Sequence, residues 1–94
     1  MTKFEEKFSA YCGVRYGVSV SSGTTALHLA LAALGIGKGD EVIVPDYTMI
    51  ATSNVAILCG AKPVFADVEK ETMCMDINNL PITKRTKAII YVSI

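Results

Sequence analysis

The stretch that decides the fold is SSGTTAL, residues 21–27, which joins a predicted strand to a predicted helix. Residues 16–20 are short and β-prone, whereas residues 24–34 form an almost wholly apolar helical run. A turn of small residues between them leaves backbone N–H groups free at the start of the helix. These donors, the helix dipole and the hydroxyls of Ser22 and Thr24 predict an anion site that suits a phosphate group.

The same stretch is also typical of an ordinary helix N-cap, because Ser and Thr cap helices in many proteins. Two other phosphate-binding patterns, G-x-x-x-x-G-K-[ST] and G-x-G-x-x-G before a helix, are absent. The glycines at 35, 37 and 39 follow a predicted helix and precede a predicted strand, so we expect them to end the helix and turn the chain. The residues alone leave the cap and the anion site both open.

The rest of the chain alternates between helical and strand patterns. Apolar positions in residues 4–12 form one helical stripe (Phe4, Phe8, Tyr11 and Cys12), and further elements are predicted as strands at 42–44, 63–66 and 88–92, a helix at 48–59 and a polar loop at 69–85. This order predicts an α/β fold with three layers, in which helices cover both faces of a largely parallel sheet. Ligands in such folds lie at the carboxyl ends of the strands, so we expect residues 21–25 and 45–49 to converge.

Length and composition predict an incomplete unit. The 94 residues allow one small domain or a piece of a larger one, and a hydrophobic share of 51% is high for that length. Residues 88–94 read as a buried strand with no polar tail, so we expect a truncated chain. The helix at 24–34 is apolar on nearly all sides, which predicts cover from a sheet on one side and from another element or subunit on the other.

Charge and cysteine usage exclude several classes of partner. Nine basic residues balance nine acidic ones without a basic block, so we expect neither nucleic acid nor an anionic membrane as a partner. No apolar run is long enough to span a membrane and no leader is visible, which favours a cytoplasmic protein. The three cysteines lack C-x-x-C spacing, so we expect buried reduced thiols and no metal site.

Several blocks of sequence together carry a resemblance. They are GVRYGVSVSSGTTALHLAL at 13–31, GKGDEVIVPDYTMIAT at 37–52, GAKPVFADV at 60–68 and TKRTKAII at 83–90. In this order and spacing they resemble the nucleotide-sugar aminotransferases of the DegT/DnrJ/EryC1/StrS family. The resemblance implies that residues 1–94 are the N-terminal part of the large, cofactor-binding domain of a fold type I, aspartate-aminotransferase-like enzyme. Members are typically homodimers with cofactor sites at the subunit interface.

The resemblance also implies roles for three residues. Gly23 and Thr24 are expected to hold the phosphate of pyridoxal 5′-phosphate, and Met49 is expected to lie over its pyridine ring. Most relatives carry an aromatic residue at the position of Met49, but a thioether also packs favourably on a ring face. Asp46 and Tyr47 are weaker candidates to face the substrate. We expect His28 to be a core or interface residue and Asp67 to cap a loop.

The implied reaction moves an amino group from an amino acid, usually glutamate, to a nucleotide-linked keto-sugar, for polysaccharide, lipopolysaccharide or glycan biosynthesis. In the family the Schiff-base lysine and the acid beside the pyridine nitrogen both lie beyond the position of Ile94. We therefore assign no catalytic residue and expect this chain alone to be inactive. Two alternatives remain: a sugar dehydratase or deaminase that uses the same cofactor, and a non-catalytic sensory relative.

Overall fold

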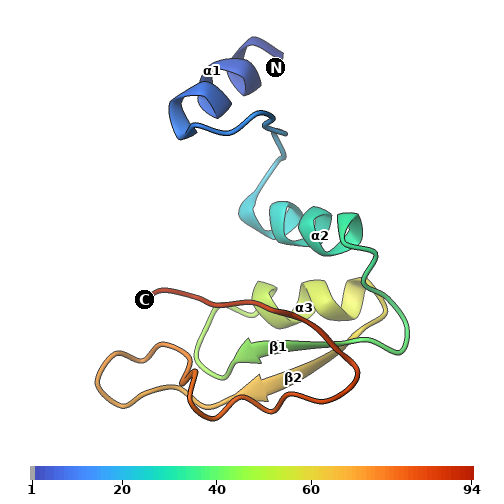
Figure 1. Ribbon diagram of the computed structural model, residues 1–94, viewed down its shortest axis with the longest axis vertical. Helices are drawn as coiled ribbons and strands as arrows, with labels where there is room; N and C mark the ends of the chain where they lie inside the picture. Colours follow the sequence, from blue (N-terminus) through green and yellow to red (C-terminus); the bar gives the residue numbers. More distant parts are fainter. Residues whose placement is uncertain (1) are drawn as a thin grey trace.

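Three parallel strands form the sheet of the computed structural model, which describes residues 2–94. Strand β1 lies in the middle, in the order β2-β1-β3; Figure 1 labels β1 and its neighbour β2. The elements in chain order are α1 Thr2–Cys12, α2 Gly23–Ala33, β1 Glu41–Pro45, α3 Ala51–Leu58, β2 Lys62–Ala66 and β3 Thr86–Ile89. The α/β class and the parallel sheet that the sequence predicts are therefore confirmed.

Strand β1 is buried on both faces. Val42 and Val44 belong to the core cluster that includes Val55 of α3, whereas Ile43 belongs to a second cluster with Met75. The exposed fraction of Val42, Ile43 and Val44 is 0%. A central strand of a parallel sheet meets apolar neighbours on both sides, which is why these three positions form an unbroken apolar run.

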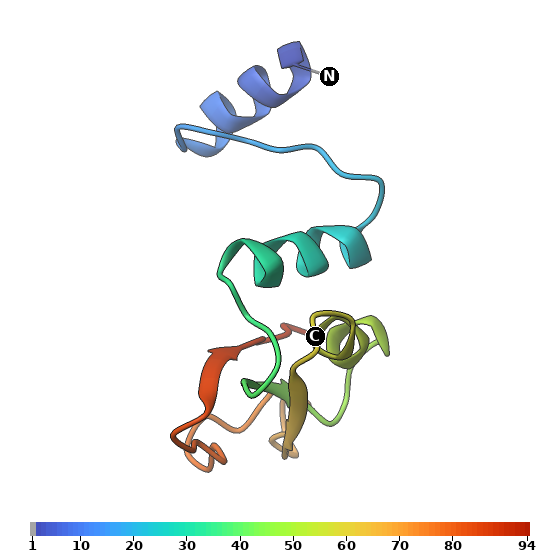
Figure 2. The same cartoon turned by 90° about the vertical axis from the view of Figure 1, so that its right-hand side faces the viewer.

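The two faces of the sheet are covered differently. Helix α3 contacts β1 and β2, and α2 packs on α3 rather than on the strands. Figures 1 and 2 show these two helices on one side of the sheet. On the other side, Met75 and Leu80 of the loop after β2 complete the second core cluster. Within residues 2–94, a loop and not a helix therefore covers this second face.

The strand predicted at residues 16–20 does not form, and this prediction was wrong. The segment runs as an extended connection between α1 and α2, away from the sheet (Figure 2). Its residues Tyr16 and Val18 are 79% and 71% exposed. A β-prone pattern reports a local preference, but a strand also needs a neighbour that accepts and donates its backbone hydrogen bonds. Consequently the turn at residues 21–25 does not follow a strand of this sheet.

Two predicted boundaries also shift. The helix predicted at 48–59 begins only at Ala51, because residues 48–50 form a turn in which the Thr48 hydroxyl pairs with the Thr52 hydroxyl at 2.8 Å. The strand predicted at 88–92 is β3, which starts at Thr86 and ends at Ile89. Its neighbour β1 ends at Pro45, a residue with no N–H to continue the ladder.

Helix α1 stands apart from the sheet and is tied to the segment that follows it. The Glu5 carboxylate accepts hydrogen bonds from the Ser19 N–H at 2.7 Å and the Ser19 hydroxyl at 3.0 Å. Gly17 passes so close to α1 that an added Cβ would lie 3.2 Å from the Glu5 carbonyl oxygen. Residues 13–20 therefore pack against α1, and the close approach requires glycine at position 17.

The aromatic stripe predicted for the first helix forms but is exposed. The rings of Phe4 and Phe8 stack with centroids 5.7 Å apart, and Tyr11 follows on the same face at 88% exposure. The radius of gyration is 14.8 Å, against about 12 Å for a compact domain of this length. The apolar stripe of α1 is thus available for contact beyond residues 2–94.

Two further expectations concern the burial of the cysteines and the absence of a membrane-spanning segment. All three cysteines are free, and Cys12 is exposed, contrary to the expectation that they are buried; Cys59 and Cys74 are half-buried. None of the helices within residues 2–94 has the length and apolar character needed to cross a bilayer.

Replacing the central core residue tests this description. We expect Ile43→Ala to lower the free energy of unfolding by about 3 kcal/mol, because it leaves a cavity between β1 and the loop that carries Met75. Ile82→Ala removes the same atoms from a side chain that is 63% exposed and serves as the control. Urea unfolding followed by circular dichroism measures both, and equal losses in the two variants would contradict the assignment of the core.

Candidate functional site

The start of α2 is a complete capping box. The N–H of Thr25 donates to Ser22 Oγ at 3.2 Å, and the N–H of Ser22 donates to Thr25 Oγ1 at 3.0 Å. Ser22 has the extended backbone typical of an N-cap. The helix cap, one of the two interpretations of this stretch, is therefore confirmed.

The cap leaves two donors open. The Ala26 N–H donates to the Ser22 carbonyl at 3.0 Å, whereas the N–H groups of Gly23 and Thr24 find no acceptor among residues 2–94. Both residues are exposed, and a Cβ added to Gly23 would meet no atom within 4 Å. The capping box and an anion site are thus compatible, because they use different N–H groups of the same helix start.

The two loops singled out in the sequence lie on the same side of the molecule. Figure 1 shows that α2 and α3 both begin on the side toward which β1 and β2 point. The loop after β1 carries Tyr47, which is 54% exposed, and Met49, which is 79% exposed. The open helix start and this loop thus face one edge, the edge where parallel α/β proteins hold their ligands.

A pair of carboxyl groups, which sequence reasoning missed, lies at the same edge. Pro45 and Ala66 are partners in the β1–β2 register, and the Asp46 N–H donates to the Ala66 carbonyl at 3.0 Å. Asp46 and Asp67 therefore follow the two strands side by side. Desolvation, together with the hydrogen bond and charge of Asp67, raises the pKa of Asp46 above its usual value. The signal was available in the sequence: each of two adjacent parallel strands is followed directly by Asp.

The Asp67 side chain therefore contacts Asp46, where the sequence suggested a loop cap. Within its own loop, Asp67 forms a hydrogen bond through its backbone: its carbonyl accepts from the Asp76 N–H at 2.8 Å. His28 is half-buried and lines an apolar hollow of about 310 Å³ on α2, together with Val20, Thr25, Leu29 and Ala32. Residues 2–94 contain no His, Cys, Asp and Glu group arranged to hold a metal ion.

A parallel sheet covered by helices on one face, with an open helix start on the side of its carboxyl edge, defines an α/β protein. The chain belongs to the DegT/DnrJ/EryC1/StrS aminotransferase family, whose model matches residues 1–94. Enzymes of this family depend on pyridoxal 5′-phosphate.

Three similar proteins illustrate the match. The GDP-perosamine synthase of Caulobacter vibrioides is 51% identical over 94 residues, which cover 98% of this chain and 25% of that protein. The UDP-2-acetamido-2-deoxy-3-oxo-D-glucuronate aminotransferase of Pseudomonas aeruginosa is 44% identical and is matched over 100% of this chain and 27% of its own length. The crystal structure of NtdA from Bacillus subtilis with bound cofactor PMP superposes with a TM-score of 0.90 at 38% identity, covering 96% of this chain and 21% of that one. The chain thus spans about a quarter of the length of the curated relatives it matches.

The pairing of Asp46 with Asp67 predicts how the ionisation of Asp46 depends on pH. Because the pKa of Asp46 is raised in the folded state, its ionisation disfavours folding as the pH rises through that pKa. We expect Asp67→Asn to lower the pKa of Asp46 toward the value of an isolated aspartate, measured from the carboxyl carbon shift by NMR. Glu71→Gln removes one charge from the same loop without touching Asp46, so it should leave that pKa in place. An unchanged titration in Asp67→Asn would contradict the pairing.

Proposed function

We propose that this chain is the N-terminal part of the cofactor-binding large domain of a sugar aminotransferase that uses pyridoxal 5′-phosphate. The reaction transfers an amino group from an amino acid, with glutamate as the expected donor, to a nucleotide-linked keto-sugar. The observation that carries the proposal is the pair of open N–H groups at Gly23 and Thr24, in a chain that the family model matches throughout. The names of the two relatives, a GDP-perosamine synthase and a UDP-sugar aminotransferase, support the nucleotide-sugar substrate class.

The residues at the helix start fit the cofactor's phosphate. A phosphate needs several N–H or O–H donors, and this site supplies two backbone N–H groups and the hydroxyl of Thr24 at the positive end of α2. Gly23 leaves space for the phosphate to approach the backbone, since nothing within 4 Å occupies the position of a Cβ. The capping box holds the helix start in shape through Ser22 and Thr25 without using those donors.

Met49 is the residue of this chain that we assign to the cofactor ring. It lies in the turn before α3, and its carbonyl accepts from the Thr52 N–H at 3.1 Å, which fixes the backbone of the turn. Its side chain is 79% exposed, and the loop between β1 and α3 that carries it lies on the side where α2 also begins. A flexible thioether packs on an aromatic ring face with less directional preference than an aromatic side chain, so Met49 positions the ring without the stacking geometry that Phe or Tyr would impose.

The chain's own contribution to the chemistry is binding and orientation. When bound, pyridoxal phosphate supplies the electron sink that amino-group transfer requires. Gly23 and Thr24 anchor the phosphate, Met49 orients the ring, and Asp46 with Asp67 places a proton-holding carboxyl pair at the same edge. We place the catalytic lysine and the acid beside the ring nitrogen in sequence that follows Ile94 in relatives, so the 94-residue chain alone is catalytically inactive.

We further propose a homodimer that works in the cytoplasm. Support for dimerisation comes from the apolar surface left open on α1 and α2: Phe4, Phe8 and Tyr11 are more than half exposed, and Leu29 is 46% exposed. Clustered exposed apolar side chains of this kind are typical of surfaces that contact another protein surface. The support for a cytoplasmic location is that the three cysteines are not paired with one another, together with the nucleotide-sugar class of substrate.

Gly23→Ala separates cofactor binding from folding. We expect it to weaken pyridoxal phosphate binding about tenfold or more, because the added methyl group lies where the phosphate must approach the two N–H groups. Stability should change little, since Gly23 has an ordinary backbone and open space around it. Gly37→Ala, whose Cβ would meet only ordinary contact distances, is the matched control. Absorbance titration with pyridoxal phosphate measures affinity, and equal affinity in both variants would contradict the assignment.

The activity itself is tested in the protein that carries this chain at the full length of its relatives. We expect it to convert glutamate and a nucleotide-linked keto-sugar into 2-oxoglutarate and an amino sugar, measured by mass spectrometry of the sugar nucleotide. The 94-residue chain alone should give no turnover. Loss of water from the sugar without amino transfer would favour the dehydratase alternative, and failure to bind pyridoxal phosphate would favour a non-catalytic relative.

A further inference from the structure

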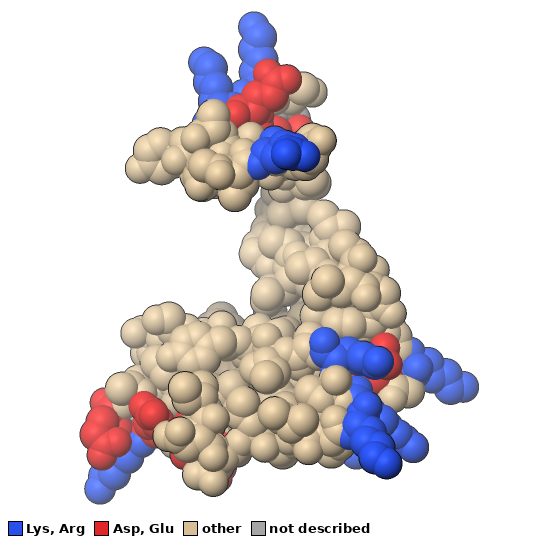
Figure 3. Space-filling view, in the orientation of Figure 1, with Lys and Arg blue, Asp and Glu red and all other residues tan. Residues whose placement is uncertain are grey.

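The charges of the sheet region are segregated between its two edges. Five basic residues gather where the three strands begin, against two acidic ones, Asp40 and Glu41; the basic residues are Lys38, Lys62, Lys84, Arg85 and Lys87. At the opposite edge the loops after β1 and β2 carry mostly acidic residues. Figure 3 shows mainly blue side chains with a red group among them on the right of the sheet region, and mainly red side chains with a blue one beside them on the left. The amino edge of the sheet is therefore a region of positive potential.

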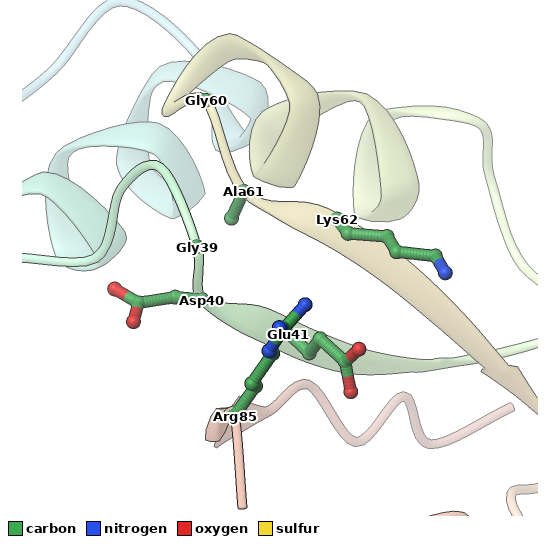
Figure 4. Close-up of a pocket in the computed structure, with 7 residues that line it drawn as sticks. All are labelled: Gly39, Asp40, Glu41, Gly60, Ala61, Lys62 and Arg85. Carbon is green, nitrogen blue, oxygen red and sulfur yellow. The ribbon is translucent and has the colours of Figure 1, made fainter. Parts of the chain in front are cut away.

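A pocket opens within this basic edge. It has a volume of about 150 Å³ and is lined by Gly39, Asp40, Glu41, Gly60, Ala61, Lys62 and Arg85 (Figure 4). Arg85 rises from the chain before β3 toward the start of β1, whereas the Lys62 side chain extends along β2 away from Gly39, on the same side as the Glu41 carboxylate. This volume is room for a small ion but is well below that of pockets for drug-sized ligands, about 300 Å³ or more.

The polar groups around the pocket are unevenly satisfied. Glu41 Oε1 accepts from the Thr83 hydroxyl at 2.7 Å, and Asp40 Oδ2 accepts from the Gly37 N–H at 3.0 Å. The side chains of Lys62 and Arg85 have no hydrogen-bond acceptor in the described part of the chain. The Gly39 N–H likewise has none there. The pocket therefore combines two cationic side chains and one backbone donor that are all free to bind an acceptor.

The backbone of the pocket wall is shaped by two glycines in the left-handed region. Gly39 has φ of +91° and Gly60 has φ of +84°. A side chain at either position is strained, and a Cβ on Gly60 would also lie 3.6 Å from the Lys38 nitrogen. The turns before β1 and β2 thus carry no side chain at positions 39 and 60, which leaves the pocket wall between Lys62 and Arg85 free of side-chain atoms there.

We propose that this pocket binds a small oxyanion of the phosphate type, held by the Lys62 ammonium, the Arg85 guanidinium and the Gly39 N–H. Arginine presents paired donors that match two oxygens of such an ion, and lysine adds a point charge. The site lies at the amino edge of the sheet, whereas Gly23 and Thr24 serve the carboxyl side. The inference does not depend on the proposed function.

NMR titration of the ¹⁵N-labelled protein with inorganic phosphate separates the two edges. We expect saturable shifts of the Gly39, Gly60 and Ala61 amide signals at constant ionic strength, distinct from any shifts at Gly23 and Thr24. Lys62→Gln with Arg85→Gln should weaken the amino-edge binding about tenfold or more. Both substitutions keep the backbone bonds in which Lys62 N–H donates to Asp40 and Glu41 N–H donates to Arg85.

The control is Lys3→Gln with Lys7→Gln, which removes the same charge from α1 and should leave the amino-edge affinity unchanged. Glu41→Gln should have the opposite effect on affinity. It removes the negative charge of the carboxylate that extends to the same side of the pocket as Lys62, and it should therefore tighten phosphate binding. The proposal is overturned if chloride at equal ionic strength produces the same amide shifts. It is also overturned if the amino-edge affinity is the same in the Lys62 and Arg85 double variant as in the unmodified protein.

Discussion

Burial of β1 on both of its faces is the constraint on which the rest of this structure depends. Val42 and Val44 hold α3 and, through it, α2 on one side, while Ile43 holds the long loop after β2 on the other. Because β1 is paired on both edges, its register fixes both ends of the neighbouring strands. The carboxyl pair of Asp46 and Asp67 at one end, and the placement of Lys62 and Arg85 on either side of the start of β1 at the other, are consequences of that single register.

The start of α2 shows how one turn serves two purposes. A helix leaves its first N–H groups without internal partners, and side-chain capping satisfies only some of them. Here Ser22 and Thr25 satisfy each other's N–H groups, and the donors of Gly23 and Thr24 remain open. The stability of the helix start and its capacity to bind an anion therefore reside in different residues, which allows each to be changed without the other.

Local patterns in the sequence predicted most of the elements but not their partners. The apolar runs at β1 and β2 and the small-residue turn before α2 were sufficient, because each has a strong local signal. The segment at 16–20 failed for the opposite reason: its residues prefer an extended backbone, but none of residues 2–94 lies beside it to form a ladder. The pairing of Asp46 with Asp67 and the pocket at Lys62 and Arg85 escaped notice because they arise from register and from the packing of distant segments, which single-sequence periodicity does not encode.

The bond between Glu5 and Ser19 joins α1 to the segment that follows it, in a part of the molecule that lies apart from the sheet. Helix α1 shares no core cluster with the sheet, and its tether is a solvent-accessible carboxylate whose pKa is lowered by the Ser19 N–H and hydroxyl. A lowered pKa means that the bond persists through the neutral range and is lost only as acid protonates Glu5 below its usual pKa. The protection factor of the Ser19 amide should therefore fall under acid, relative to its intrinsic exchange rate, while the amides of β1 stay protected.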